Sequence, residues 1–347
     1  MYAGKLVVAQ IMEPTLLYAF RHVVVRYVDE RKVKSFEELL GMNLFLNPAE
    51  ATSYRDKFRS TWAYHVFAKL RSIKRDMLRR SEGEAYLLAR YARLHGKPLD
   101  LANPRRFTEK LFRRLIALNR GEHQEFTALA DKYLVRAYVA RTVGEEYLIK
   151  LLWQGNDPNN IPFDTLPTEY VIKSNHACRQ VIVVKGDADR ADMRRRASGW
   201  LKTNFYWSNR EHQYYAIKPK VLIEEYLKTE NDCGPLDYRF WCFRGQPEII
   251  QVDNHAHDIN PFYDTSWNLL DLYYREGVSR PHLPKPANLD EMMSVASRLS
   301  APFDFVRVDL YNIDGKIHFG ELTFTPVGGG AKFRPESWDQ LLGEKWL

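Results

Sequence analysis

The chain has 347 residues, of which 45% are hydrophobic and 13% aromatic, which is typical of a folded protein with two or three domains. Its net charge of +7 is compatible with phosphate-rich partners. The basic runs are more typical of solvated helix faces, so we do not expect nucleic acid as a partner. No run reaches the ~20 apolar residues that span a membrane, and the start has no secretory signal, which indicates a cytoplasmic protein.

Residues 1–42 are predicted to be helical. The run Ala3–Met12, followed by Phe20-Arg21 and Arg26-Tyr27, resembles the amino-terminal segment of certain insertion-sequence transposases. This segment has no catalytic Asp-Asp-Glu domain. We interpret it as the remnant of a mobile-element insertion that has no part in the function of the protein. The alternative is an active DNA-binding arm.

Residues 43–125 are predicted to form a helical region. It contains an aromatic helix near residues 54–67, a basic helix over 70–94 that ends at Gly96, and a helix that begins after Pro104 with Thr108 in its first turn. A further helix is predicted through Asp131–Val139, ending near Gly144.

The remaining chain mixes strands and helices, which predicts an α+β fold. Strands are expected over 147–152, 169–176, 181–184 and 221–227, and then two strands over 238–252 around Arg244-Gly245. Helices are expected over 187–206 and 289–299. Gly328–Gly330 is expected to be a flexible loop before a short final helix.

Two stretches near the end carry the clearest signal. Residues 305–311 and 318–324 both alternate apolar and polar side chains, and Asp314-Gly315 lies between them. Because Gly accepts the positive φ of a tight turn, this pattern predicts an antiparallel hairpin.

The faces of this hairpin suggest metal chemistry. Arg307, Asp309 and Tyr311 share one face of the first strand, while Glu321 and Thr323 share a face of the second. If the register brings these faces together, two carboxylates and a hydroxyl could hold one or two Mg²⁺ ions that carry phosphate oxygens. The alternative is a half-exposed hairpin whose charges face water.

Other residues extend this into a nucleotide site. Lys132 and Lys173 could hold polyphosphate as point charges. Glu224 and Glu225 end an apolar strand, where backbone groups become available to a planar base. Together with Asp309 and Glu321, this order of groups is that of an ATP-grasp enzyme.

Residues 75–347 closely resemble the TupA-like ATP-grasp family, which is found in bacterial cell-surface polysaccharide loci. The matching motifs are Asn103–Lys110, Asp131-Lys132, Gly144–Leu148, Val171–Lys173 with Asn175-His176, Glu224–Leu227, Asp237–Phe243, Val306–Tyr311 and Phe319–Phe324 with Pro326.

The resemblance implies a role for each matching residue and a domain organisation. Lys132 and Lys173 would contact ATP phosphates; Glu224, Glu225, Tyr226 and Leu227 would bind adenine; Asp237 would lie near the ribose; Arg239 and Arg307 would neutralise phosphate; Asp309, Glu321 and Thr323 would hold Mg²⁺. His176 is a candidate for a substrate or base role. The lid subdomain would span 126–228, and the C-terminal subdomain with the metal site would span 229–347.

The implied reaction is an ATP-dependent carboxylate-amine ligation through an acyl-phosphate, joining an amino acid to a sugar or uronic acid. Small-molecule substrates are therefore expected, including sugar nucleotides, and a homodimer is left open. A glycosyltransferase, a sugar kinase and an inactive fusion or DNA-binding remnant are the alternatives. Where the family has glycines, this chain has Ala177–Gln180, so the lid should close less tightly or use Arg179 as a cation.

Overall fold

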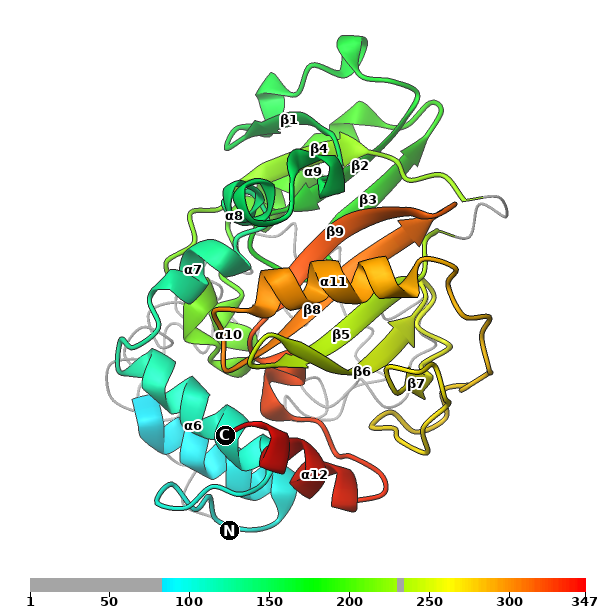
Figure 1. The fold of residues 1–347 in the computed structure, drawn as a ribbon. Coiled ribbons are helices and arrows are strands. Elements are labelled where there is room, and N and C mark those ends of the chain that lie inside the picture. Colours follow the sequence, from blue (N-terminus) through cyan, green and yellow to red (C-terminus); the bar gives the residue numbers. More distant parts are fainter. Residues whose placement is uncertain (1–82, 230–233) are drawn as a thin grey trace, which may run out of the picture. The chain divides into compact units, whose positions relative to one another are not determined.

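The structure, a computed structural model, describes residues 83–229 and 234–347 (Figure 1). The expected helices of residues 1–70, including the transposase-like segment, lie outside this range. The described residues belong to one compact unit, in which helices surround two antiparallel sheets, so the predicted α+β class is confirmed. None of the helices described is both long enough and apolar enough to span a bilayer.

The first sheet has the strand order β1-β4-β2-β3, and all its pairings are antiparallel. Its strands are β1 (Leu151–Gly155), β2 (Glu169–Ser174), β3 (Val181–Lys185) and β4 (Val221–Glu225). The helix α9 (Arg190–Leu201) covers one face, where Met193 and Ala197 pack with Ile172 and Ile223. The opposite face of this sheet carries the side chain of Lys173, one of the predicted site residues.

The second sheet has the order β7-β6-β5-β8-β9 and is also antiparallel. Its strands are β5 (Asp237–Phe243), β6 (Gln246–Asp253), β7 (Phe262–Tyr263), β8 (Phe305–Ile313) and β9 (Lys316–Thr323). The predicted hairpin is confirmed as β8 and β9. Its turn residues Asp314 and Gly315 have φ values of 51° and 81°, the left-handed conformation that a two-residue hairpin turn requires.

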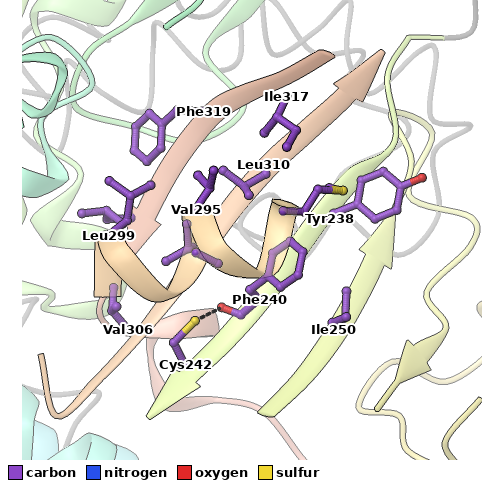
Figure 2. Packing of buried hydrophobic residues seen from close by; sticks show 14 of the residues in the cluster. Tyr238, Phe240, Cys242, Ile250, Val295, Leu299, Val306, Leu310, Ile317 and Phe319 are labelled. Carbon is purple, nitrogen blue, oxygen red and sulfur yellow. Dashed lines mark hydrogen bonds between the residues drawn. The ribbon is translucent and has the colours of Figure 1, made fainter. Parts of the chain in front are cut away.

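One face of the second sheet is covered by α11 (Leu289–Ser300). Val295 and Leu299 of this helix pack over Phe240, Leu310 and Phe319 of the strands (Figure 2). Because side chains alternate along a strand, placing these apolar residues under α11 sends their polar neighbours to the opposite face.

That opposite face is divided into two parts. At one end α6 (Phe107–Asn119) and α12 (Ser337–Lys345) cover an aromatic cluster, in which Phe107 contacts the rings of Trp241, Phe305 and Trp346. The remaining part carries the charged side chains of β5, β6, β8 and β9. The candidate site is built on this second part of the face, where Asp253, Arg307 and Asp309 are buried.

The helix predicted through Asp131–Val139 and ending near Gly144 is confirmed only from Val135 onward. The helix α7 (Glu125–Ala130) ends before Asp131, and α8 (Val135–Thr142) begins after a turn. The Asp131 carboxylate accepts hydrogen bonds from the backbone N–H groups of Tyr133 and Leu134, so it stabilises the turn that precedes the second helix. Lys132 therefore lies in a turn between two helices.

Two smaller expectations also differ. The strand expected over 147–152 is replaced by a 3₁₀ turn at Glu145–Tyr147, and β1 starts only at Leu151. Gly328 and Gly329 belong to a buried 3₁₀ turn (Pro326–Gly329) rather than a flexible loop. The remaining short helices are α10 (Tyr206–Asn209) and the 3₁₀ turns Pro158–Asn160, Phe163–Thr165 and His212–Tyr214. A further helix covers residues 83–95 and ends at Gly96, as predicted.

Candidate functional site

The two predicted metal carboxylates lie on the same face of the hairpin. Asp309 pairs with Glu321 across β8 and β9, and Arg307 pairs with Thr323. The Thr323 hydroxyl donates to Glu321 Oε1 at 3.0 Å. The register of β8 and β9 therefore brings the polar faces of the two strands together.

Arg307 is held rigidly beside these groups. Its Nε donates to Asp309 Oδ1 at 2.7 Å and its Nη2 donates to Asp309 Oδ2 at 2.6 Å, which is a bidentate pair. The same Nη2 lies 3.1 Å from Thr323 Oγ1. A buried guanidinium in this position is a preorganised cation at the edge of the carboxylate pair.

Arg239 extends the polar row along the sheet. In the strand register, Arg239 lies opposite Asp309 of β8 on one side and opposite Gln251 of β6 on the other. Its guanidinium donates to Asp237 Oδ2 at 2.8 Å and to Asp253 Oδ2 at 2.6 Å, and its Nε lies 3.7 Å from Asp309 Oδ2. Asp253 is fully buried, so it fixes Arg239 from the side away from the hairpin.

The two carboxyl groups of the pair have opposite electrostatic environments. Burial, reinforced by the nearby Asp237, raises the pKa of Asp309 to about 7 despite the attraction of Arg307. Burial would also raise the pKa of Glu321, but Lys132, Arg307 and the Thr323 hydroxyl outweigh it and lower that pKa to about 2. A divalent cation next to Asp309 would favour its ionised form.

Lys132 contacts both the loop at 177–180 and the hairpin. Its Nζ lies 3.4 Å from Glu321 Oε2 and donates to the carbonyl oxygen of Ala177 at 3.2 Å. Asn175 donates to Asp131 Oδ2 at 2.9 Å, which ties the start of the same loop to the turn that carries Lys132. One lysine thus bridges the loop at 177–180 and a predicted metal ligand.

Lys173 and Glu224 face each other across β2 and β4. Lys173 Nζ lies 2.5 Å from Glu224 Oε2, and Arg136 of α8 lies 3.5 Å from Glu224 Oε1. Glu225 pairs with Tyr170, one of the residues covered by α9, so its side chain points away from Lys173. Of the two predicted glutamates, only Glu224 is on the site side. Tyr226 and Leu227 follow the strand end and are half-buried.

Sequence reasoning did not single out Val181 and Val183 as site residues. They pair with Lys173 and Val171, so they share the face of Lys173, and their exposed fractions are 37% and 39%. These two exposed valines form an apolar surface beside Lys173 on the edge strand of the sheet. Their i, i+2 spacing opposite Lys173 was the available signal. Arg136 and Asp253 were also missed, because their partners are distant in sequence.

His176 is placed differently from the other candidates. Its side chain is buried, its Nδ1 lies 3.0 Å from Asn175 Oδ1, and its Nε2 lies 3.4 Å from Thr203 Oγ1. Burial lowers the pKa of its imidazole. These contacts support the loop after β2 and do not direct the ring toward Asp309 or Glu321.

The residues present fit a metal-bound nucleotide. Mg²⁺ in phosphate-transfer sites uses one or two carboxylates together with water and phosphate oxygens, which is the set that Asp309 and Glu321 offer. Within residues 83–229 and 234–347 no cluster of three His, Cys, Asp or Glu side chains could hold a metal alone. Asp237 Oδ1 is buried and has no hydrogen-bond partner among the described residues, so it could accept from a sugar hydroxyl.

Comparison with protein families decides the classification. The family model described as TupA-like ATPgrasp matches residues 109–347. The chain belongs to the TupA-like ATP-grasp family. This match covers both sheets and every predicted site residue of this ATP-grasp chain, whereas the resemblance of residues 1–42 to transposases received no support. A comparison with curated proteins gave no significant match.

Several solved enzymes are similar to part of this ATP-grasp chain. D-alanine–D-alanine ligase from Bacillus anthracis, complexed with ATP, is 16% identical over 57% of this chain and 54% of its own, with a TM-score of 0.33. The ADP complex of purK, N5-carboxyaminoimidazole ribonucleotide synthetase, is 11% identical over 58% and 46%, with a TM-score of 0.38. The ATP-grasp ligase PsnB, complexed with a precursor variant, Mg and ADP, is 13% identical over 69% and 67%, with a TM-score of 0.35.

The first two of these alignments span only about half of each solved enzyme. At such TM-scores the classification rests on the family model rather than on these structures.

Proposed function

We propose that this protein is an Mg²⁺- and ATP-dependent ligase that activates a carboxylate as an acyl-phosphate and transfers it to an amine, forming a C–N bond. The observation that supports this most directly is the Asp309–Glu321 pair, which is flanked by Arg307 and Arg239 on the same sheet face and by Lys132 from the turn between α7 and α8. Bound Mg-ATP would supply the phosphoryl group and the metal charge.

The two lysines would hold the phosphates. Lys132 and Lys173 come from different elements. Lys132 forms an ion pair with Glu321, and Lys173 forms one with Glu224. Both ammonium groups are therefore held near the site without being buried, since each side chain keeps 17% of its surface exposed. A polyphosphate between the sheets would compete with these carboxylates for the same two cations.

The two arginines would offset the charge that develops during phosphoryl transfer. Their guanidinium groups are fixed by Asp309, Asp237 and Asp253, so they need little reorganisation when the charge appears. Arg307 is next to the carboxylate pair, where a γ-phosphate would lie. Arg239 is one strand further, where the carboxylate substrate could approach.

The first sheet would bind the nucleoside. Val181 and Val183 provide an apolar surface for a base, and the backbone after Glu224 provides its hydrogen-bonding partners. The unpartnered Asp237 Oδ1 would accept from the ribose. The loop at Ala177–Gln180, which Lys132 already contacts, would shield the acyl-phosphate from water.

The finer part of the proposal concerns the substrates. We place the reaction in bacterial cell-surface polysaccharide synthesis, with an amino acid as one partner and a sugar or uronic acid as the other. The support for this context is membership of the TupA-like family. A cytoplasmic location belongs to the same proposal.

Calorimetric titration of Mg-ATP into the full chain, compared with the Asp309→Ala, Glu321→Ala double variant, tests the proposal. Micromolar binding that is lost in the double variant would support the site. A milder variant, Glu321→Gln, keeps the shape and removes only the charge. Glu248→Gln on β6, whose carboxylate pairs with Lys345 at 2.6 Å outside the site, is the matched control and should bind normally.

A screen for amine- and carboxylate-dependent phosphate release then tests the reaction. Release of ADP and phosphate only when both substrates are present would support ligation. ADP formation with a sugar alone, leaving a phosphorylated sugar, would instead indicate a kinase. Failure of Mg-ATP to bind the wild-type protein would overturn the ligase proposal altogether.

A further inference from the structure

A second cationic feature lies on α6, away from the nucleotide site. Positions 106, 110, 113, 117 and 120 follow one face of this helix, and four of them carry Arg or Lys. All of these positions except 106 border a hollow of about 450 Å³. Its lining includes Lys110, Arg113, Arg114 and Arg120, and none of its described lining residues is a predicted nucleotide-site residue.

The positive charge in this hollow is only partly compensated. Arg114 is paired with Asp304, and the Trp346 indole N–H also donates to Asp304 Oδ2 at 2.7 Å. Arg120 is paired outside the hollow with Glu84 at 2.7 Å. Glu122, the remaining carboxylate of the lining, forms no ion pair with a described residue.

Among the residues that the structure describes, no carboxylate forms an ion pair with Lys110 or Arg113. Lys110 donates only to the carbonyl oxygens of Gly343, at 2.9 Å, and Trp346. Arg113 is exposed and makes no ion pair with another described residue. Burial and then the repulsion of Arg113 lower the pKa of Lys110. An anion bound between these two cations would relieve that repulsion.

The hollow also has an apolar side. Leu101, Ala117 and Trp346 contribute to its lining, and the Arg114 guanidinium lies 4.2 Å from the centroid of the Trp346 ring. Its volume is within the range of small-molecule sites, at the size of a monosaccharide-like ring with one substituent. A phosphate monoester carries close to two negative charges at neutral pH, which matches the two unpaired cations.

We propose that the hollow beside α6 binds a free phosphate monoester carried on a monosaccharide-sized ring, with Lys110 and Arg113 contacting the phosphate. The ring lies against Leu101 and Ala117. This site is separate from the ATP site and does not depend on the proposed ligase activity. A second ligand site would let the protein hold or sense a phosphorylated sugar while the nucleotide site is occupied.

The test is calorimetric titration of glucose 1-phosphate into the full chain. Glucose, which lacks the phosphate, and inorganic phosphate, which lacks the ring, are titrated for comparison. We expect glucose 1-phosphate to bind more tightly than either probe. Arg113→Gln, an exposed substitution that should not affect folding, should weaken binding about tenfold. Arg195→Gln on α9, which is also exposed, is the matched control and should leave binding unchanged.

The same titration is repeated in the Asp309→Ala, Glu321→Ala variant, where binding should be retained because the two sites are separate. Loss of binding there would assign the sugar phosphate to the nucleotide site and overturn the proposal. So would equal affinity in Arg113→Gln, or no binding at millimolar concentration. Vesicles containing phosphatidylinositol 4-phosphate form the last arm, and binding to these alone would identify a lipid headgroup instead of a free ligand.

Discussion

Asp309 and Glu321 face each other across β8 and β9, yet Phe319, only two residues before Glu321, points to the other side of the sheet and into the core under α11. Residues two apart normally share a face of a strand. The register shifts between Asp309 and Leu310, so that Gly320 is an extra residue between Phe319 and Glu321. This bulge keeps Phe319 in the core and still places Glu321 beside Asp309.

Replacing Gly320 with Ala should therefore damage the site. A Cβ at this position would lie 3.0 Å from the Asp309 carbonyl oxygen and 3.3 Å from the Tyr311 ring. We expect a loss of about 1–3 kcal/mol in the free energy of unfolding. We also expect Mg-ATP affinity to fall, because the strain acts on the backbone of Asp309 itself. Urea denaturation and calorimetry measure the two effects.

Gly199→Ala is the control for this substitution. Gly199 lies within α9, and a Cβ there would meet no atom within 4 Å. The control should be neutral or slightly stabilising, since Ala favours a helix interior over Gly. Equal behaviour of the two variants would mean that the bulge tolerates a side chain and does not fix the register.

The hairpin could be predicted from sequence, but the bulge could not. Asp314-Gly315 between two alternating runs defines a turn by local rules, and those rules hold. Whether Glu321 reaches Asp309 depends on where one residue is inserted, and that is set by the packing of Phe319 and Leu322 under α11. A local sequence pattern does not show where in a strand an extra residue is inserted, and so does not show which face the following side chains occupy.

The role of Asp253, whose carboxylate holds Arg239, could not be predicted from sequence for a similar reason. Asp253 ends β6 and is followed by a polar loop, so nothing near it in sequence distinguishes it from a surface residue. In the fold it is fully buried, accepts from Arg239 and Arg275, and lies 3.1 Å from His257 Nδ1. The break at Asp131-Lys132 escaped prediction because the apolar period of α7 and α8 continues across it.

Asp253→Asn should destabilise the protein and loosen Arg239. Removing one member of a buried ion pair leaves its partner uncompensated, and we expect a loss of about 3 kcal/mol in the free energy of unfolding. Asp271→Asn removes a carboxylate whose side chain is 81% exposed and 3.5 Å from Arg280, so it should cost less than about 0.5 kcal/mol. Similar losses in both variants would contradict the anchoring role of Asp253.

Cys178 offers a chemical probe of the loop at 177–180. It is exposed, whereas Cys242 is fully buried and burial raises the pKa of its thiol to about 12. Burial also raises the pKa of Cys178, so alkylation should be measured at mildly alkaline pH, where more thiolate is present. Cys233 lies outside the described residues and is replaced by Ser in all samples.

In this background we expect iodoacetamide to modify Cys178 and spare Cys242. Mg-ATP should slow the modification of Cys178 several-fold, because a nucleotide held by Lys132 would be covered by the adjoining loop. Peptide mass spectrometry follows each thiol separately. The same rate with and without Mg-ATP, at a nucleotide concentration that saturates the calorimetric site, would show that the loop does not close over the nucleotide.

The pH dependence of stability should report on a buried carboxyl group under the end of β9. Glu211 is 4% exposed, and it accepts hydrogen bonds from Thr325 Oγ1 at 2.6 Å and Asn209 Nδ2 at 3.2 Å. Burial raises the pKa of Glu211, although Thr325, Asn209 and Arg90 act in the opposite direction. The folded protein therefore binds this proton more tightly than the unfolded chain does.

The sign of the effect follows from this difference. A raised pKa contributes stability that is fully present below the unfolded value near 4.5 and is lost as the pH rises through the folded value. Glu211→Gln removes the titration and keeps an oxygen that can accept from Thr325. The free energy of unfolding of the variant, relative to wild type, should thus increase from about pH 4 to about pH 8. Urea denaturation across this range measures it, with the exposed Glu344→Gln as control. A difference that stays constant or shrinks as the pH rises would mean that Glu211 is ionised in the folded protein without penalty, stabilised by Thr325, Asn209 and Arg90.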